Sequence, residues 1–554
     1  MLSLIADGLS NAEMADHLVV SEATVTTWPP AGGWSRSSPS SGPLTGSSAT
    51  SGGSPAAREL IGGANRRLLS VEPLEPARRS IRPRPWDRYR ATWYDYGENR
   101  AVVVEGRLGE PGKETVTETA ARPLSSPEEF EAAVAVVAQD AEFGPAVRDG
   151  KLRPYRAMPP LVNEELPDGR VERTLTVGLL PADGAADARH EIVGVNMIRR
   201  QVERYSDGAP AGARAAEQLC GAPSANQSTT GRGVPGQAKI TVRKGSTRLW
   251  SLVAVRPSAS SGTDGSGVEL RSVYYRGKPV MHQAHVPVLN VRYQNNQCGL
   301  YRDWQWEEGM FQARGRNPAR AFRLCSEPAR TILDTGSDFG NFRGVAVYVA
   351  GQEVVLVSEM KAGWYRYVSE WRLHADGTIR PRFGFDAIDN SCVCLRHFHH
   401  VYWRFDFTVE TSGNNLIFEH NDPPLQPGTN VWQPQPFEVR RLRDAARKRR
   451  WRVQNANSGR GYTIIPGTND GTASGDAYAK GDVWLLRYRR GQIDDYPLAG
   501  GTEIQIDKYL NRESIHRQDV VVWYGAHFTH DASQEGAGAG HDHIVGPDLV
   551  PHDW

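Results

Sequence analysis

The chain lacks both long apolar runs and an excess of one charge. Its 554 residues hold 65 Lys and Arg against 64 Asp and Glu, which gives a formal net charge of +1. No run of eighteen apolar residues exists, so no membrane-spanning helix is predicted. The near-zero charge predicts no general attraction to nucleic acid or anionic lipid. The N-terminus also lacks the apolar core and cleavage site of a secretory signal, so a cytoplasmic location is the default expectation.

One segment departs from this balance. The basic run RRLRDAARKRRWR begins at Arg440 and precedes an expected strand at Trp451. It offers a surface for an anion or a nucleic acid, but we interpret it as a solvated connection.

Cysteine is scarce as well. Five cysteines cannot all pair with one another, so no complete disulfide framework is predicted. Cys392 and Cys394 lie just before a histidine pair, at a spacing that suits zinc or cuprous copper. We favour the alternative that they are structural thiols or pair with one of the isolated cysteines, Cys298 or Cys325. Cys220 is expected to stand alone.

The first 28 residues differ in character from the rest. Residues 2–25, LSLIADGLSNAEMADHLVVSEATV, resemble the helix-turn-helix of LuxR-type regulators. Trp28-Pro29-Pro30 then stops the second helix at once, because proline is excluded from a helix interior. We therefore interpret residues 1–28 as a truncated fragment and residues 29–84 as a Ser, Gly and Pro-rich linker.

The remaining chain divides into two folded regions. Residues 85–220 alternate strand-like segments with one helix, which is expected to begin near Ser126 with Pro127 in its first turn. This order predicts a small α/β domain. Residues 221–237 are a second linker. Residues 238–554 contain alternating apolar and polar segments broken by Gly and Asp-Gly turns, which predicts a large β-sandwich and a mainly β protein.

A histidine pair dominates that region. His397 and His399, in CLRHFHHVYWRFDF, are two residues apart on an expected strand and so point to one face. His530, far downstream, is predicted to complete a cup of three imidazoles, with His527 as its rival. Such a cup suits copper, zinc or iron. His400, His541 and His543 are expected to be solvated or hydrogen-bonded surface histidines. His541-Asp542-His543 could bind a metal, but their Gly-rich surroundings favour a flexible tail.

A tyrosine upstream of the histidines helps to indicate which protein family the chain resembles. Tyr365 lies in GWYRYVSEWRLHADGTI, with a tryptophan six residues on and then Asp-Gly-Thr-Ile; His397 and His399 are followed by an Arg-x-Asp. With the later stretch WRVQNANSGRGYTIIPG, these motifs resemble the copper amine oxidases, over roughly residues 85–545. The resemblance implies a β-sandwich catalytic domain, copper on His397, His399 and His530, and topaquinone formed from Tyr365.

The resemblance also implies a catalytic base and a partner. Glu307, in YRDWQWEEG, takes the position of the family's aspartate, with Glu308 as its neighbour. The implied reaction is oxidation of a primary amine by dioxygen to an aldehyde, with release of ammonia and hydrogen peroxide, in a homodimer. Trp364 and Arg366 replace the family's Asn and acidic residue around the tyrosine. The alternative is therefore an impaired relative that keeps the fold and binds copper.

Overall fold

The computed structural model describes most of the chain beyond the N-terminal region. The described residues are 18–20, 65–74, 88–107, 110, 113–119, 123, 125–162, 171–181, 191–203, 220–222, 236–294, 300–388, 392–495, 503–530 and 543–554. Most of the sequence similar to the helix-turn-helix, residues 1–28, lies outside them, as does most of the predicted linker that follows.

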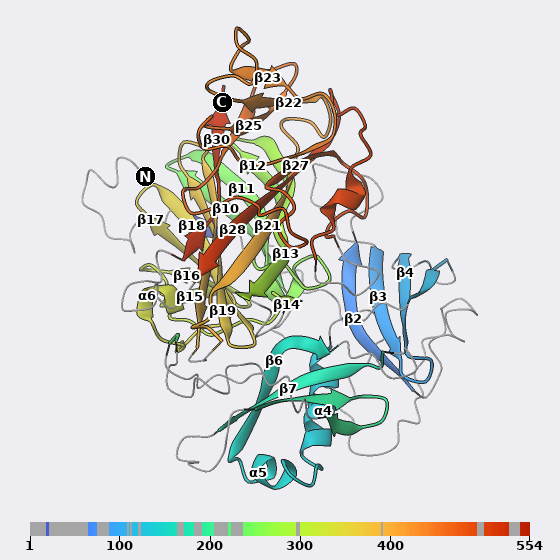
Figure 1. Ribbon diagram of the computed structural model, residues 1–554. Coiled ribbons are helices and arrows are strands. Elements are labelled where there is room, and N and C mark those ends of the chain that lie inside the picture. The colour runs from blue at the N-terminus through green and yellow to red at the C-terminus, as the bar shows by residue number, and fades with distance from the viewer. Residues whose placement is uncertain are drawn as a thin grey trace.

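Two large sheets form the main body of the molecule (Figure 1). The first has ten strands, all antiparallel to their neighbours. Its order is β1 (Leu18–Val20), β10 (Gln237–Lys244), β11 (Thr247–Val255), β12 (Glu269–Tyr275), β13 (Lys278–Tyr293), β21 (His397–Phe407), β28 (Val520–His530), β27 (Val483–Arg487) and β24 (Val439–Arg441), with β14 (Leu300–Arg302) paired to β13.

The second sheet has twelve strands, of which only β16 and β17 pair in parallel. Its order is β15 (Gly315–Ala319), β16 (Phe322–Cys325), β17 (Val345–Ala350), β18 (Glu353–Ala362), β19 (Tyr365–His374), β20 (Ile379–Ala387), β30 (Asp548–His552), β26 (Gly461–Ile465), β25 (Arg450–Asn455), β22 (Asn415–His420) and β23 (Trp432–Pro434), with β29 (Ile544–Val545) on β20. The short elements are α6 (Ile332–Thr335), η2 (Pro257–Ala259) and η4 (Ile506–Tyr509).

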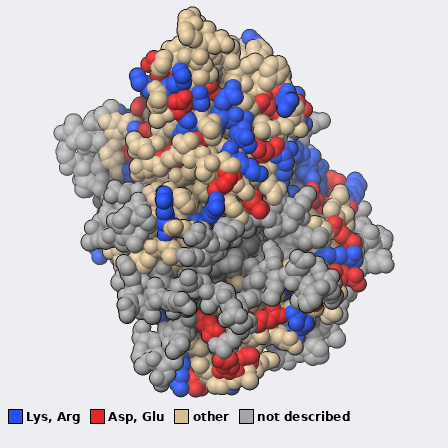
Figure 2. All heavy atoms as spheres, viewed as in Figure 1, with Lys and Arg blue, Asp and Glu red and all other residues tan. Residues whose placement is uncertain are grey.

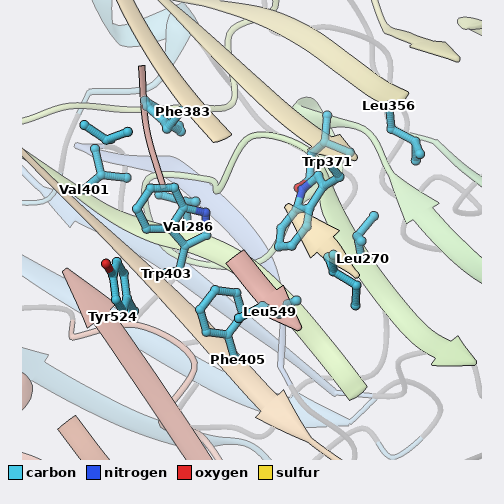
Figure 3. Packing of buried hydrophobic residues seen from close by; sticks show 14 of the residues in the cluster. Leu270, Val286, Leu356, Trp371, Phe383, Val401, Trp403, Phe405, Tyr524 and Leu549 are labelled. Carbon is cyan, nitrogen blue, oxygen red and sulfur yellow. The ribbon is translucent and has the colours of Figure 1, made fainter. Parts of the chain in front are cut away.

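The core lies between these sheets. Figure 3 shows Trp403 and Phe405 of β21 close to Phe383 of β20 and Leu549 of β30, all fully buried. Burial of such large side chains is the main stabilising contribution, at about 25 cal/mol per Å² of apolar surface. The predicted β-sandwich and mainly β fold class are confirmed.

β21 is buried on both faces, since ten of its eleven residues are buried. It lies between β13 and β28 within the ten-stranded sheet. One face of β21 is covered by the opposite sheet. On its other face, Tyr402 belongs to a buried cluster that includes Ile506 of η4. Both histidine-bearing faces of β21 are therefore shielded from water.

A smaller region carries two four-stranded sheets. One contains β2 (Arg66–Leu74), β3 (Arg88–Asp95), β4 (Arg100–Arg107) and β5 (Thr115–Thr119); the other contains β6 (Leu152–Val162), β7 (Thr174–Pro181), β8 (Glu191–Asn196) and β9 (Gln201–Glu203). Helices α4 (Pro127–Val137) and α5 (Gly144–Arg148) accompany the second sheet. As predicted, α4 starts after Ser126, whose hydroxyl accepts a hydrogen bond from the Glu129 amide at 3.1 Å.

One N-terminal segment forms a strand at the edge of the ten-stranded sheet. Leu18–Val20 form strand β1, which pairs antiparallel with β10. The edge of β10 offers a ladder of backbone hydrogen bonds, and two consecutive valines suit a strand better than a helix.

On the face seen in Figure 2, charged side chains of both signs lie close together over the described residues. The basic run follows this rule: Arg440 contacts Asp507, Arg443 pairs with Asp482 and Arg449 lies 3.5 Å from Glu419. These arginines are thus engaged with carboxylates of the same chain. No helix in the described part of the chain is long and apolar enough to cross a membrane.

Candidate functional site

Strands β21 and β28 bring the distant histidines together. His397 begins β21 and His530 ends β28, and the antiparallel pairing sets these two residues opposite each other. The Nδ1 atom of His530 lies 3.1 Å from Nε2 of His397. Period-two alternation turns His399 to the same side as His397, with ring centroids 5.0 Å apart.

Tyr365 reaches this cluster from the opposite sheet. It is the first residue of β19, it is 1% exposed, and its hydroxyl contacts Nε2 of His397. Its ring centroid is 4.7 Å from that of His399, almost perpendicular to it. The two sheets of the sandwich therefore meet here through a phenol on one side and imidazoles on the other.

The tautomer of His397 is fixed by the chain before it. Its Nδ1 donates to the carbonyl of Leu395 at 2.5 Å, so Nε2 of the neutral ring carries a lone pair. This lone pair faces both the Tyr365 hydroxyl and Nδ1 of His530.

His399 is a buried imidazole in a partly apolar setting. Phe385 stacks on it with a centroid separation of 4.5 Å. Neither of its ring nitrogens makes a hydrogen bond within the described residues. Burial, with neighbouring imidazoles adding to it, holds the pKa of His399 well below its usual range. The ring is neutral at physiological pH, which is the form that binds metals.

The ring nitrogens of His397, His399 and His530 are atoms of the kind that bind a transition metal. Among the residues that the structure describes, no group of three or more His, Cys, Asp or Glu side chains is arranged so as to hold a metal ion. Two nitrogens that bind one metal at about 2.0–2.1 Å lie on the order of 2.9–3.4 Å apart. The 3.1 Å between His397 and His530 lies in that range, and His399 adds buried nitrogens that lack another use.

His527 is separated from this cluster. It faces the other side of β28, where its Nδ1 lies 2.9 Å from Nδ1 of His400 and its Nε2 lies 3.0 Å from Asp482. Of the two rivals for the third position, the structure brings His530 next to His397 and His527 next to His400.

Two histidines expected at the surface are buried. His400 is 3% exposed and His543 is 5% exposed. The prediction of surface side chains is wrong for both, because His400 lies on a strand covered on both faces and β29 anchors the segment that begins at His543 to β20. His541 lies outside the described residues.

Glu307 is buried and contacts Trp304 and Lys361. Its Oε2 accepts a hydrogen bond from Trp304 Nε1 at 3.1 Å, and its Oε1 is 3.5 Å from Nζ of Lys361. Burial lowers the pKa of Lys361 to about 8, although the Glu307 carboxylate acts against this. Glu308 is committed to an ion pair with Arg256, whose Nε lies 3.0 Å away.

Asp303 is the carboxyl group that sequence reasoning missed. The Tyr367 hydroxyl donates to it, and the Tyr367 ring stacks on Tyr365 at 5.3 Å, nearly parallel. Burial raises the pKa of Asp303 well above its usual range, against the hydrogen bond from Tyr367. Strand alternation places Tyr365 and Tyr367 on one face, and Asp303 belongs to the same segment as Glu307, so these signals were present.

The residues flanking Tyr365 are accommodated. The Trp364 indole donates to the Tyr293 hydroxyl at 3.1 Å, and the Tyr293 ring stacks on His397 at 4.7 Å. Arg366 forms a two-bond ion pair with Asp338, at 2.6 and 2.9 Å. Tyr293 therefore links the indole to the imidazole, and the Tyr365 hydroxyl still contacts His397.

The cysteines secure the loop before β21. Cys394 forms a disulfide with Cys220, 174 residues earlier, so the soft-metal role considered for it is excluded and Cys220 does not stand alone. Cys392 is also disulfide-bonded, whereas Cys325 is a buried free thiol. Cys298 lies outside the described residues.

Comparisons with known proteins point to one fold. Neither a protein-family model nor a curated protein sequence matches the chain. The structure is similar to a copper-containing benzylamine oxidase from Hansenula polymorpha, with a TM-score of 0.56 and 11% identity over 88% of this chain and 93% of that one. It is also similar, with a TM-score of 0.49 and 11% identity, to the lysyl oxidase of Pichia pastoris, over 88% of this chain and 85% of that one. The described chain thus has the mainly β sandwich fold of a copper-containing amine oxidase.

Proposed function

We propose that this protein is a copper- and quinone-dependent oxidase of primary amines. The observation that carries the proposal is the contact between the Tyr365 hydroxyl and Nε2 of His397, inside a cluster that also holds His399 and His530. An oxidisable phenol beside three buried imidazoles is the arrangement needed to oxidise a tyrosine in place. The shared sandwich fold supports it.

The side chains would divide the work. His397, His399 and His530 would hold copper through ring nitrogens, with the Leu395 carbonyl fixing the tautomer of His397. Copper and a quinone derived from Tyr365 would supply the electron transfer that ordinary side chains cannot provide. Tyr367 would hold the Tyr365 ring flat by stacking. The enclosing core excludes bulk water from the site.

The net reaction balances with two co-substrates. One primary amine, one dioxygen and one water give one aldehyde, one ammonia and one hydrogen peroxide. Two electrons and two protons leave the amine and reduce dioxygen to peroxide. The chain therefore needs a group that accepts the proton from the carbon next to the amine.

Two buried carboxyl groups can accept that proton. Sequence alignment to the family motif favours Glu307, whose contacts are with Trp304 and Lys361. Geometry favours Asp303, because it is linked through Tyr367 to the ring that stacks on Tyr365. Burial raises the pKa of Asp303 above that of an exposed carboxyl group, whereas the hydrogen bond from Tyr367 opposes this shift and favours the carboxylate, the form that accepts a proton. We assign the proton transfer to Asp303 and keep Glu307 as the alternative.

The test is formation of the quinone. Protein purified without metal is given copper and air, and a visible spectrum and a redox-cycling quinone stain are recorded. We expect a coloured, stainable product in the wild type and in the matched control Tyr367→Phe, and none in Tyr365→Phe. A colourless wild type would contradict the proposal.

A second function has its own supporting observation. Trp364 and Arg366 stand where related motifs carry Asn and an acid, and both are locked in place by Tyr293 and Asp338. A protein that binds copper, loses it in His397→Ala and forms no quinone would be a copper-binding relative without turnover.

A further inference from the structure

A fourth histidine lies at the copper site. His543 begins the last described segment of the chain, directly before β29, and β29 pairs with β20 of the twelve-stranded sheet. Its carbonyl accepts a hydrogen bond from the Phe385 amide at 3.1 Å. This backbone contact and the ladder that follows it hold His543 next to the end of β28.

The ring of His543 packs directly against a proposed ligand. Its centroid is 4.6 Å from that of His530, at an interplanar angle of 75°. His530 is in turn 4.7 Å from His397, at 79°, and His397 is 5.0 Å from His399, at 73°. The four imidazoles thus form a continuous chain of edge-to-face neighbours.

These separations are those of rings around one metal. Imidazoles bound at about 2.0–2.1 Å, at neighbouring positions separated by about 90–110°, have ring centroids on the order of 4.5–5 Å apart. All three neighbouring pairs fall within or at the edge of that range. The three separations are therefore compatible with four imidazoles arranged around a single metal ion.

The surroundings of His543 also favour a role beyond packing. The ring is 5% exposed and also lies near Phe528, with ring centroids 5.4 Å apart. Burying an imidazole in such a setting costs free energy, which metal coordination offsets. Four nitrogens in a tetragonal arrangement are a preferred environment of Cu(II).

We propose that His543 is a fourth imidazole ligand of the copper that His397, His399 and His530 bind. This inference rests on the proposed copper site and deepens it. A fourth nitrogen would take one of the coordination positions that three histidines leave to solvent. It would also tie copper binding to the ordering of the C-terminal segment around β29.

The experiment counts nitrogens rather than turnover. Cu(II) is added to the metal-free protein, and the nitrogen couplings are resolved by continuous-wave and pulsed electron paramagnetic resonance with isotopically pure copper. We expect four equatorial nitrogens in the wild type and three in His543→Ala, with a Cu(II) affinity lowered about 10-fold or more. His543→Gln keeps the volume of the side chain, and His552→Ala removes a histidine of β30 that contacts Arg452 instead.

Each result decides the matter. Three nitrogens in both the wild type and His543→Gln, with unchanged affinity, would overturn the fourth ligand and leave the three-histidine site standing. A wild type that binds Cu(II) no better than His397→Ala would overturn the copper site itself. A drop from four nitrogens to three in both His543 variants, with native circular dichroism and no change in His552→Ala, would establish the ligand.

Discussion

Strands β21 and β28 carry a pair of facing histidines on each side of the sheet, and the two pairs differ in their surroundings. On the inner side, His397 and His530 have nitrogens 3.1 Å apart, and Tyr365 approaches from the opposite sheet. On the outer side, His400 and His527 have nitrogens 2.9 Å apart, next to the buried carboxylate of Asp482.

The difference shows that a short distance between imidazoles does not define a metal site. On the outer side, Asp482 takes up the second nitrogen of His527 and also pairs with Arg443. Burial acts to raise the pKa of Asp482, but the hydrogen bond with His527 and the charge of Arg443 bring it below its usual value. The outer pair is part of a closed network of charges. The inner pair faces a phenol and two further imidazoles, which suits a redox metal.

The largest expected effect is on Cu(II) affinity, which should depend on the inner histidine pair and much less on the outer pair. His530→Ala should weaken Cu(II) binding by more than the about 10- to 100-fold that loss of a supporting partner costs. His527→Ala should weaken Cu(II) binding by no more than about 10- to 100-fold, the cost of losing a supporting partner. Competition with a coloured chelator measures both. Equal losses in the two variants would mean that the inner side is not the copper site.

The next effect concerns the proton acceptor of the inner side. Asp303→Asn should lower kcat by about a hundred- to ten-thousandfold, the usual contribution of a general base, and Glu307→Gln should lower it much less. Rates with a primary amine and its α-deuterated form, measured after quinone formation is confirmed, report on that step. The reverse order of the two losses would return the assignment to Glu307.

A third effect is on stability, because a disulfide holds the loop that leads into β21. Removal of the Cys220–Cys394 disulfide by Cys394→Ser should lower the free energy of unfolding by about 2–4 kcal/mol. Cys325→Ala, which removes the buried free thiol, is the matched control and should cost less. Denaturant unfolding of the metal-free protein measures both values. No difference between the variants would show that the disulfide does not constrain the unfolded chain.

The smallest effect is a pH dependence from the outer side. Burial, followed by the facing His527, lowers the pKa of His400 well below 6.5, while Asp476 opposes this and Arg292 reinforces it. Below pH 6.5 the unfolded chain binds a proton that folded His400 does not, so stability falls as the pH falls. His400 should contribute up to about 1.4 kcal/mol per pH unit to the slope, and this contribution should be lost in His400→Asn, while His399 and the other buried histidines keep theirs. Unfolding of the metal-free protein between pH 7 and pH 5 tests this, and an unchanged slope in the variant would contradict it.

The sequence was informative where the pattern was local. The spacing of Tyr365, His397 and His399 and the alternating segments around them predicted the sandwich and a cluster that the structure brings together. The start of α4 could be predicted because a cap needs only Ser126 and its neighbours.

Contacts between residues far apart in the chain could not be predicted from the sequence in this way. Asp303 reaches Tyr367 across 64 residues, and Cys220 reaches Cys394 across 174, and no local rule pairs them. His543 was misread because its Gly-rich surroundings suggested a tail, whereas the pairing of β29 with β20 anchors it. Leu18–Val20 became a strand because β10 offered a free edge, which is a property of the fold and not of three residues.

The two histidine pairs also make β21 sensitive to its length. A slip of one residue against β28 would turn every side chain of the strand over, so that His400 would face Tyr365 while His397 and His399 pointed outward. A shift of two residues would restore the facing but move the imidazoles away from the phenol by about 6.6 Å. Substitutions in β21 therefore change the site locally, whereas any single insertion or deletion exchanges its two sides.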